Sequence, residues 1–165
     1  MIDDPVLHRL KISGRSRMGG LTSHPGEKPE QCPVCGTSAR DATCPRCGHL
    51  LWFASRLVDD VTVIHLFDSR AAVLELLDLL DNAVIDGVIG RLVINFGSIQ
   101  QVSSAALGKL IKLMHRADTV RGKLALCGLH ADLRQVFKIT NLDRVFAIFD
   151  DEVGALESFG VAAGR

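Results

Sequence analysis

Hydrophobic residues from position 51 onward follow two spacings that alternate along the chain. Short apolar runs typical of buried strands occur at residues 51–53, 61–67, 92–96, 123–127 and 144–148. Between them, apolar residues at helical spacing predict helices over residues 70–84, 104–119, 131–139 and 151–159. Strands that alternate with helices predict an α/β fold with a mostly parallel sheet and right-handed crossovers.

The helix predicted over residues 104–119 separates its apolar and charged residues. The side chains expected to face the core are Leu107, Leu110, Ile111 and Met114, and those expected to face solvent are Lys109, Lys112 and Arg116. A polar residue precedes each of the two longest helices and can cap it, Asp68 or Ser69 before the first and Ser103 or Ser104 before the second.

The first 50 residues lack this pattern and divide into two parts. Residues 1–30 hold scattered glycines and prolines with few large apolar side chains, so we expect a flexible tail. Residues 31–50 hold too few apolar side chains to build a core, so this segment needs a metal ion to fold. The chain therefore divides into a tail, a small module at 31–50 and an α/β domain at 51–160.

Four cysteines in the small module have the spacing Cys-x2-Cys-x8-Cys-x2-Cys. They are Cys32, Cys35, Cys44 and Cys47, and each half reads Cys-Pro-x-Cys-Gly. Paired x2 spacing lets four thiolates surround one tetrahedral zinc ion, and a glycine after each pair lets the backbone turn beneath it. The pattern predicts a zinc ribbon with one structural Zn²⁺ and no open coordination position. A redox Cys-x-x-Cys motif is the weaker alternative, because it would be single and would follow a strand of a larger domain.

Ser103 and Ser104 allow two interpretations, because they open a helix that follows a buried strand and a loop. Either serine can simply cap the helix. Alternatively, one of them is phosphorylated, since the exposed N–H groups and dipole at a helix N-terminus favour a phosphate. A phosphate there would also repel a partner docked on the helix.

Composition and charge narrow the possible functions. The chain has 19 basic and 19 acidic residues and a formal net charge of zero, which makes a nucleic-acid partner unlikely on electrostatic grounds. No apolar run is long enough to span a membrane and no signal peptide is evident, so we expect a cytoplasmic protein with reduced cysteines.

Cys127 falls in an apolar run and is expected to be a buried core thiol. His65, His115 and His130 are isolated, so we expect no enzyme.

Residues from about 50 to 160 resemble a STAS domain of the kind found in bacterial anti-sigma-factor antagonists. The resemblance rests on the strand at 92–96, the Ser-Ser-Ala-Ala-Leu-Gly segment at 103–108, Gly-Lys-Leu-Ala-Leu-Cys-Gly at 122–128, and residues 133–142 followed by Val-Phe-Ala-Ile. It implies a mixed sheet of four to five strands with helices packed on it. In this alignment Ser104 takes the position of the phosphorylated serine, with Ser103 as the fallback. Ser103 and Asn95 stand where the family usually has acidic residues.

The resemblance implies regulation of transcription by partner switching. The chain would bind an anti-sigma factor of the serine-kinase type through Ser103, Ser104, Lys109 and Lys112 and so free a sigma factor. Phosphorylation of Ser104 would end the binding, and a separate phosphatase would reset it. The alternative is a non-enzymatic interaction or scaffold module with a zinc ribbon, outside sigma-factor control.

Overall fold

The computed structural model of the chain describes residues 31–32, 35–38, 44–47, 53–67, 70–87 and 89–161. Five strands lie within these residues: β1 (Phe53–Val58), β2 (Val61–Leu66), β3 (Arg91–Asn95), β4 (Lys123–Cys127) and β5 (Ala147–Phe149). The helices among them are α2 (Arg70–Ile85), α3 (Ser104–Thr119), α4 (Ala131–Ile139), α5 (Glu152–Ser158) and the 3₁₀ helix η1 (Leu142–Arg144). The predicted α/β fold with a mixed sheet is confirmed.

The five strands form one sheet in the order β1-β2-β3-β4-β5. β1 and β2 are antiparallel and are joined by a two-residue turn, in which Asp59 has a positive φ of 53°. The other neighbouring pairs are parallel, and each connection between them carries a helix, as parallel pairing requires. The carboxyl ends of four strands therefore meet at one edge of the sheet.

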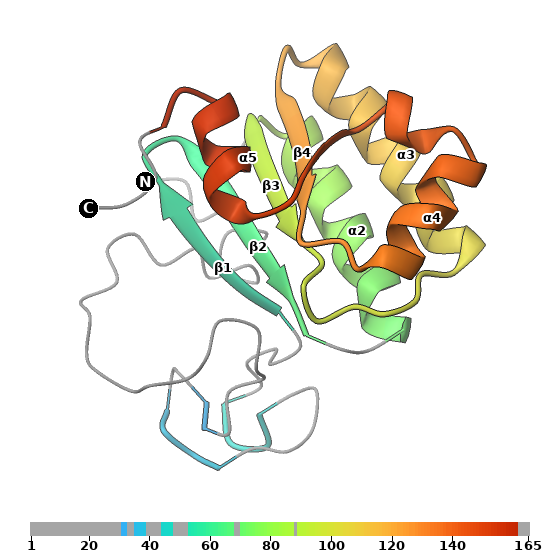
Figure 1. Cartoon of the computed structure of the whole chain (residues 1–165). Helices are drawn as coiled ribbons and strands as arrows, with labels where there is room; N and C mark the ends of the chain where they lie inside the picture. Colours follow the sequence, from blue (N-terminus) through green and yellow to red (C-terminus); the bar gives the residue numbers. More distant parts are fainter. Residues whose placement is uncertain are drawn as a thin grey trace.

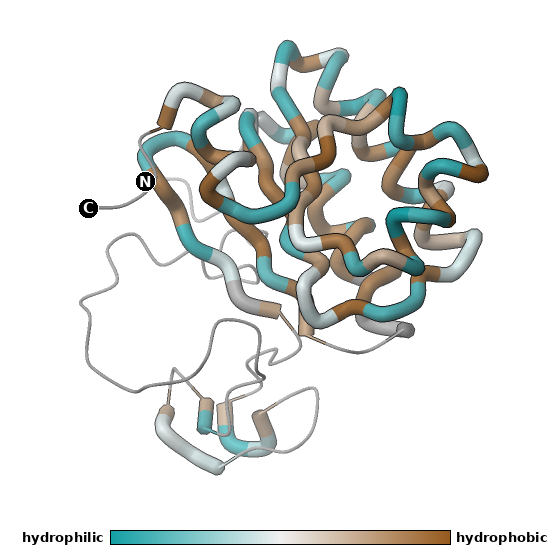
Figure 2. The backbone as a smooth tube through the Cα atoms, in the orientation of Figure 1, coloured by the Kyte–Doolittle hydropathy of each residue, from teal (hydrophilic) through white to brown (hydrophobic). Residues whose placement is uncertain are grey.

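Helices cover the two faces of the sheet unequally (Figure 1). On one face, α2, α3 and α4 pack with the strands into the larger core, which holds fully buried Leu80, Phe96, Leu110 and Phe137. Figure 2 shows the apolar residues concentrated along the strands and the inward sides of the helices, with polar residues outside. Burial of these apolar side chains is the main force that holds α3 against the sheet.

The seven-residue α5 packs on the opposite face and forms a second, smaller core. Its Leu156 and the following Phe159 cover Val63 and Cys127 of the sheet. Asp151 caps the helix by accepting a hydrogen bond from Gly154 N at 2.8 Å. This cap lies at the start of the helix that the sequence predicts over residues 151–159.

Two strands differ from their predicted positions. The strand expected at 51–53 runs from Phe53 to Val58, because β1 is a half-exposed edge strand whose polar Ser55 and Arg56 hid the pattern. Residues 51 and 52 lie outside the described part of the chain. The strand expected at 144–148 is replaced by η1 and the later β5, since Phe146 turns into the core and packs edge-on against Phe137 at 5.9 Å between ring centres.

The buried face of α3 is also broader than predicted. Leu110 is fully buried as expected, but Leu107, Ile111 and Met114 are only partly buried. The remaining core positions are filled by Ala106, Leu113 and Ala117. Small alanines at two of these positions allow α3 to lie close to the sheet and to α2. The predicted cap residues Asp68 and Ser69 lie outside the described residues.

Candidate functional site

The loop between β3 and α3 carries the two serines and is fixed by hydrogen bonds at its start. Asn95 Oδ1 accepts a bond from Gly97 N at 2.8 Å, and Phe96 N donates to Cys127 O at 2.9 Å. The ring Nε2 of His130 lies 2.6 Å from Gly97 O, which ties the start of α4 to the same loop. The loop is thus positioned by two neighbouring strands and by α4.

Gly128 permits the close approach between this loop and the end of β4. Its φ is +71°, and a Cβ atom placed there would lie 2.7 Å from Asn95 Oδ1 and 3.1 Å from Gly97 N. Both the backbone conformation and the space therefore require glycine. The side-chain pattern gave no sign of this contact, although a glycine directly after a buried strand was visible in the sequence.

The structure separates the roles of Ser103 and Ser104. Ser103 is the N-cap of α3, and its Oγ accepts a hydrogen bond from Ala106 N at 3.1 Å. Ser104 is the first helical residue, and its side chain is exposed. Because Ser103 Oγ is engaged in the cap, Ser104 is the more available hydroxyl of the two.

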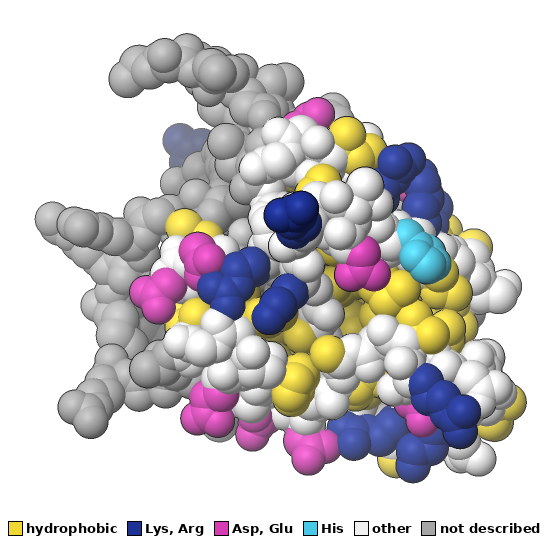
Figure 3. Space-filling view, turned by 90° about the horizontal axis from the view of Figure 1, so that it is seen from above, with side chains coloured by type: hydrophobic (Ala, Val, Ile, Leu, Met, Phe, Trp, Pro, Cys, Tyr) yellow, Lys and Arg dark blue, Asp and Glu magenta, His cyan; other side chains and the backbone are white. Residues whose placement is uncertain are grey.

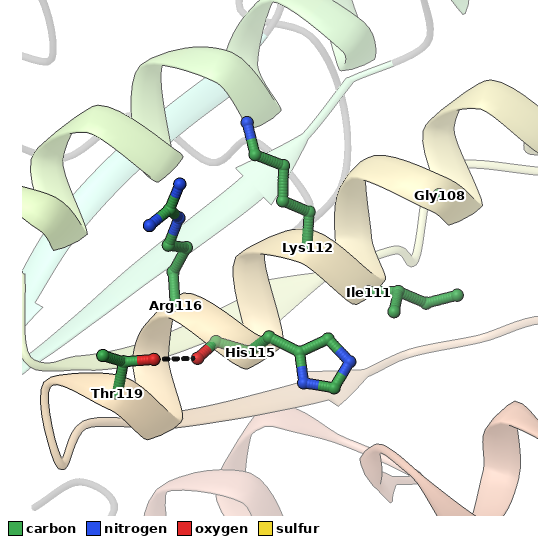
Figure 4. Close-up of a pocket in the computed structure, with 6 residues that line it drawn as sticks. All are labelled: Gly108, Ile111, Lys112, His115, Arg116 and Thr119. Atoms are coloured by element: carbon green, nitrogen blue, oxygen red, sulfur yellow. Dashed lines mark hydrogen bonds between the residues drawn. The ribbon is translucent and has the colours of Figure 1, made fainter.

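One stripe of α3 lines a shallow hollow on the surface (Figure 4). The residues that line it are Gly108, Ile111, Lys112, His115, Arg116 and Thr119. In Figure 4, Lys112 and Arg116 extend toward α2, whereas Ile111 and His115 extend to the other side of the helix. The hollow therefore has a charged border next to α2 and a less polar border away from it.

The lysines expected to face solvent are also paired with acidic residues of α2. Lys109 pairs with Asp78, and Lys112 Nζ lies 2.9 Å from Asp81 Oδ2. Asp81 is only 7% exposed, and its Oδ1 has no hydrogen-bond partner, although Arg116 Nε lies 3.7 Å away. Lys109 and Lys112 are 34% and 57% exposed, so they face solvent as predicted, and their ion pairs also hold α3 against α2.

A second hollow, of about 280 Å³, lies at the carboxyl ends of the strands and includes His65, Asn95 and the acidic residues 150–152. His65 Nε2 lies 2.7 Å from Glu152 Oε2, and Glu152 also pairs with Arg56. Burial, and secondly the charge of Arg56, lower the pKa of His65, which favours the neutral ring. His65 and His130 therefore have partners, as satisfied histidines do.

The four cysteines come together within the described residues of the N-terminal module. Their Sγ atoms all lie within 4.8 Å of one another. Four thiolates at about 2.3 Å from one tetrahedral zinc ion would lie about 3.8 Å apart, so this donor set fits Zn²⁺. Hydrogen bonding with the side chain and backbone of Thr37 lowers the pKa of Cys35 to about 6, which favours the thiolate that binds metal.

Cys127 differs from the four cysteines of the module. It is fully buried in the smaller core under α5. Burial, and secondly the charge of Asp151, raise its pKa to about 11, so almost no thiolate is present at neutral pH. This confirms the prediction of a core thiol.

The chain belongs to the STAS domain family, whose pattern matches residues 56–155. This assignment agrees with the mixed five-stranded sheet. None of the helices in the described part of the chain is long and apolar enough to cross a membrane.

Several relatives of this chain are anti-sigma factor antagonists or have been assigned to that class. BtrV of Bordetella bronchiseptica has been assigned to this class. It is 29% identical to this chain, and the match covers 46% of this chain and 65% of BtrV. The Thermotoga neapolitana homologue of TM1081, with the same assignment, is 26% identical over 64% of this chain and 95% of its own.

The anti-sigma factor antagonist SpoIIAA of Bacillus has the same fold. Its unphosphorylated form is 21% identical to this chain, with a TM-score of 0.56 over 66% of this chain and 97% of its own. A phosphorylated form of SpoIIAA is likewise known and is similar with a TM-score of 0.54, over 65% of this chain and 98% of its own.

Proposed function

We propose that this chain is an anti-sigma factor antagonist that regulates transcription by partner switching and catalyses no reaction. Unphosphorylated, it binds an anti-sigma factor of the serine-kinase type in the cytoplasm and frees a sigma factor. Phosphorylation of Ser104 ends the binding, and a separate phosphatase restores it. The observation that carries the proposal is the exposed Ser104 at the first position of α3, in a STAS domain with antagonist relatives.

The position of Ser104 makes phosphorylation an effective switch. A phosphate there gains from the N-terminal N–H groups of α3 and adds about 1.5 to 2 negative charges. Those charges fall at the start of the stripe that includes Gly108, Ile111 and His115, the surface on which we place the partner. A partner surface fitted to an uncharged serine would then bury an unpaired phosphate, which is strongly unfavourable.

The partner surface is centred on Ser103, Ser104 and the less polar border of the α3 hollow. Lys109 and Lys112 contribute at its margin, because their side chains remain 34% and 57% exposed while paired to α2. The opposite end of the sheet is seen in Figure 3, where basic and acidic side chains are mixed around a hydrophobic centre. The end of the molecule seen in Figure 3 thus presents no continuous basic surface of the kind that favours nucleic acid.

The proposal is tested with the serine kinases encoded in the same genome. The chain is incubated with each kinase and ATP, the phosphorylated residue is mapped, and binding is measured by pull-down. We expect phosphate on Ser104, no phosphate on Ser104→Ala, and binding that Ser104→Ala keeps and Ser104→Glu weakens.

Ser103→Asn is the matched control, because asparagine caps a helix as well as serine does but carries no hydroxyl. It should remain a substrate of the kinase. Loss of phosphorylation in Ser103→Asn but not in Ser104→Ala would show that Ser103 is the phosphorylated residue. Absence of both phosphorylation and kinase binding would contradict partner switching and favour the scaffold function, outside sigma-factor control.

The proposal also includes one structural zinc ion held by Cys32, Cys35, Cys44 and Cys47. The support is the convergence of four Sγ atoms in a module with hardly any other buried apolar side chains among its described residues. With its coordination shell filled by thiolates, the ion would hold the ribbon together and offer no open position for catalysis. Metal analysis should give about one zinc per chain, lost in Cys44→Ser and kept in Cys127→Ser.

A further inference from the structure

The four cysteines form two pairs that cross between the two halves of the ribbon. Cys32 Sγ lies 3.5 Å from Cys47 Sγ, and Cys35 Sγ lies 3.5 Å from Cys44 Sγ. In each pair one member is buried and the other is more accessible. Cys32 and Cys44 are 2% exposed, whereas Cys47 is exposed and Cys35 is half-buried. One sulfur of each pair thus belongs to the more exposed residue, and its partner sulfur lies 3.5 Å away.

We propose that this cluster is an oxidant-reactive site, at which hydrogen peroxide joins Cys32 to Cys47 and Cys35 to Cys44 and expels the zinc ion. The inference rests on the zinc site proposed above and adds a regulatory modification to it. It is independent of phosphorylation at Ser104, which lies in another part of the chain.

The reaction begins at exposed Cys47, because a zinc-bound cysteine is a thiolate and the thiolate is the nucleophile. Its sulfur attacks peroxide, an S–O bond forms, the O–O bond breaks and hydroxide leaves, which gives a sulfenic acid. The Cys32 thiolate then attacks the Cys47 sulfur, so that an S–S bond forms, the S–O bond breaks and a second hydroxide leaves. Two thiolates have lost two electrons in total, and one peroxide has been reduced to two hydroxides.

With Cys32 and Cys47 oxidised, only Cys35 and Cys44 would be left to hold a zinc ion, and two thiolates would not complete a tetrahedral protein site. A second peroxide converts Cys35 and Cys44 in the same way, with half-buried Cys35 as the attacking thiolate. The products are two disulfides, four hydroxides and free Zn²⁺. Each disulfide bridges the two Cys-x2-Cys motifs, in contrast to the bridges within a motif that thioredoxin-like proteins form.

The expected consequence is confined to the ribbon. The buried cluster in its described residues consists of cysteines, and neither core of the sheet includes any of the four. Oxidation should therefore unfold the zinc-dependent structure of residues 31–47 and leave the STAS domain folded. Cys127 serves as an internal control, since it is fully buried and burial raises its pKa to about 11.

The test uses the full chain, purified under reducing conditions and then freed of reductant. Zinc content is measured first, hydrogen peroxide is added, and release is followed with a chromogenic zinc chelator. Non-reducing peptide mapping then locates the disulfides. We expect loss of about one zinc per chain, bridges Cys32–Cys47 and Cys35–Cys44, unmodified Cys127, and recovery with dithiothreitol and added zinc. Cys127→Ser should behave identically.

The outcomes separate the two proposals. Protein that contains no zinc at the start overturns the zinc site and this inference with it. Zinc that is present but stays bound in excess peroxide overturns only the oxidant-reactive site. Release accompanied by bridges within a motif, Cys32–Cys35 or Cys44–Cys47, or by oxidation of Cys127, also overturns it, because the crossing pairs are the basis of the inference.

Discussion

At the scale of single residues, the serine loop depends on a position where only glycine fits. Gly128 has a left-handed backbone, and a Cβ atom added there would lie 2.7 Å from Asn95 Oδ1 and 3.1 Å from Gly97 N. Asn95 in turn accepts the bond from Gly97 that begins the loop. A change at Gly128 therefore acts directly on the segment that leads to Ser103 and Ser104.

We expect Gly128→Ala to destabilise the protein by more than the left-handed backbone alone requires, which is roughly 1–2 kcal/mol. Gly160→Ala is the matched control, because Gly160 has a similar φ of +77° but nothing within 4 Å of an added Cβ. Urea unfolding of both variants gives the comparison. Equal losses of unfolding free energy in the two variants would show that Asn95 can move away from the added methyl group.

At the scale of elements, α3 is held to α2 by a buried carboxylate. Asp81 has a side chain only 10% exposed, whereas Asp78, the partner of Lys109, is 58% exposed. Breaking an ion pair leaves a buried charge uncompensated but an exposed charge solvated. The two lysines should therefore differ in their contribution to stability, although both lie on the same helix.

Lys112→Met is expected to lower the free energy of unfolding by roughly 1–2 kcal/mol, since Asp81 keeps only the more distant Arg116. Lys109→Met should change it by less than about 0.5 kcal/mol, because Asp78 remains in water. Chemical denaturation of each variant measures both values. A larger effect at Lys109 would contradict the role given to Asp81.

How well the sequence predicts a feature depends on whether the residues that determine it are near one another in the chain or far apart. Apolar runs and helical spacing located α2, α3, α4 and α5, and the cysteine spacing identified residues that do come together. The pair between Lys112 and Asp81 was not predictable, because these residues are 31 positions apart in sequence and meet only through the packing of α3 on α2. The edge strand β1 was misplaced because one side of it is solvated, so its pattern is only partly apolar.

At the scale of the whole molecule, the ribbon and the STAS domain should lose structure independently. The ribbon depends on its metal site, while the domain has two cores that include none of the four ligands. We expect a strong zinc chelator to expose residues 31–47 to proteolysis without changing the thermal unfolding midpoint of the domain. Limited proteolysis and calorimetry on one sample test this. A joint shift of both would show that the two parts stabilise each other.

One face of the sheet is covered by a short helix, and the cysteine beneath it can be used to measure local opening. Cys127 lies beneath α5, a helix of seven residues, whereas the opposite face is covered by two helices of 16 residues as well as α4. Short peripheral helices open locally at less free energy than the core requires to unfold. A thiol reagent should therefore reach Cys127 only during rare transient detachment of α5, on a longer timescale than oxidation of the ribbon, and Leu156→Ala should speed the labelling more than it lowers global stability. The labelling rate would then measure how often α5 detaches while β3 and β4 stay paired.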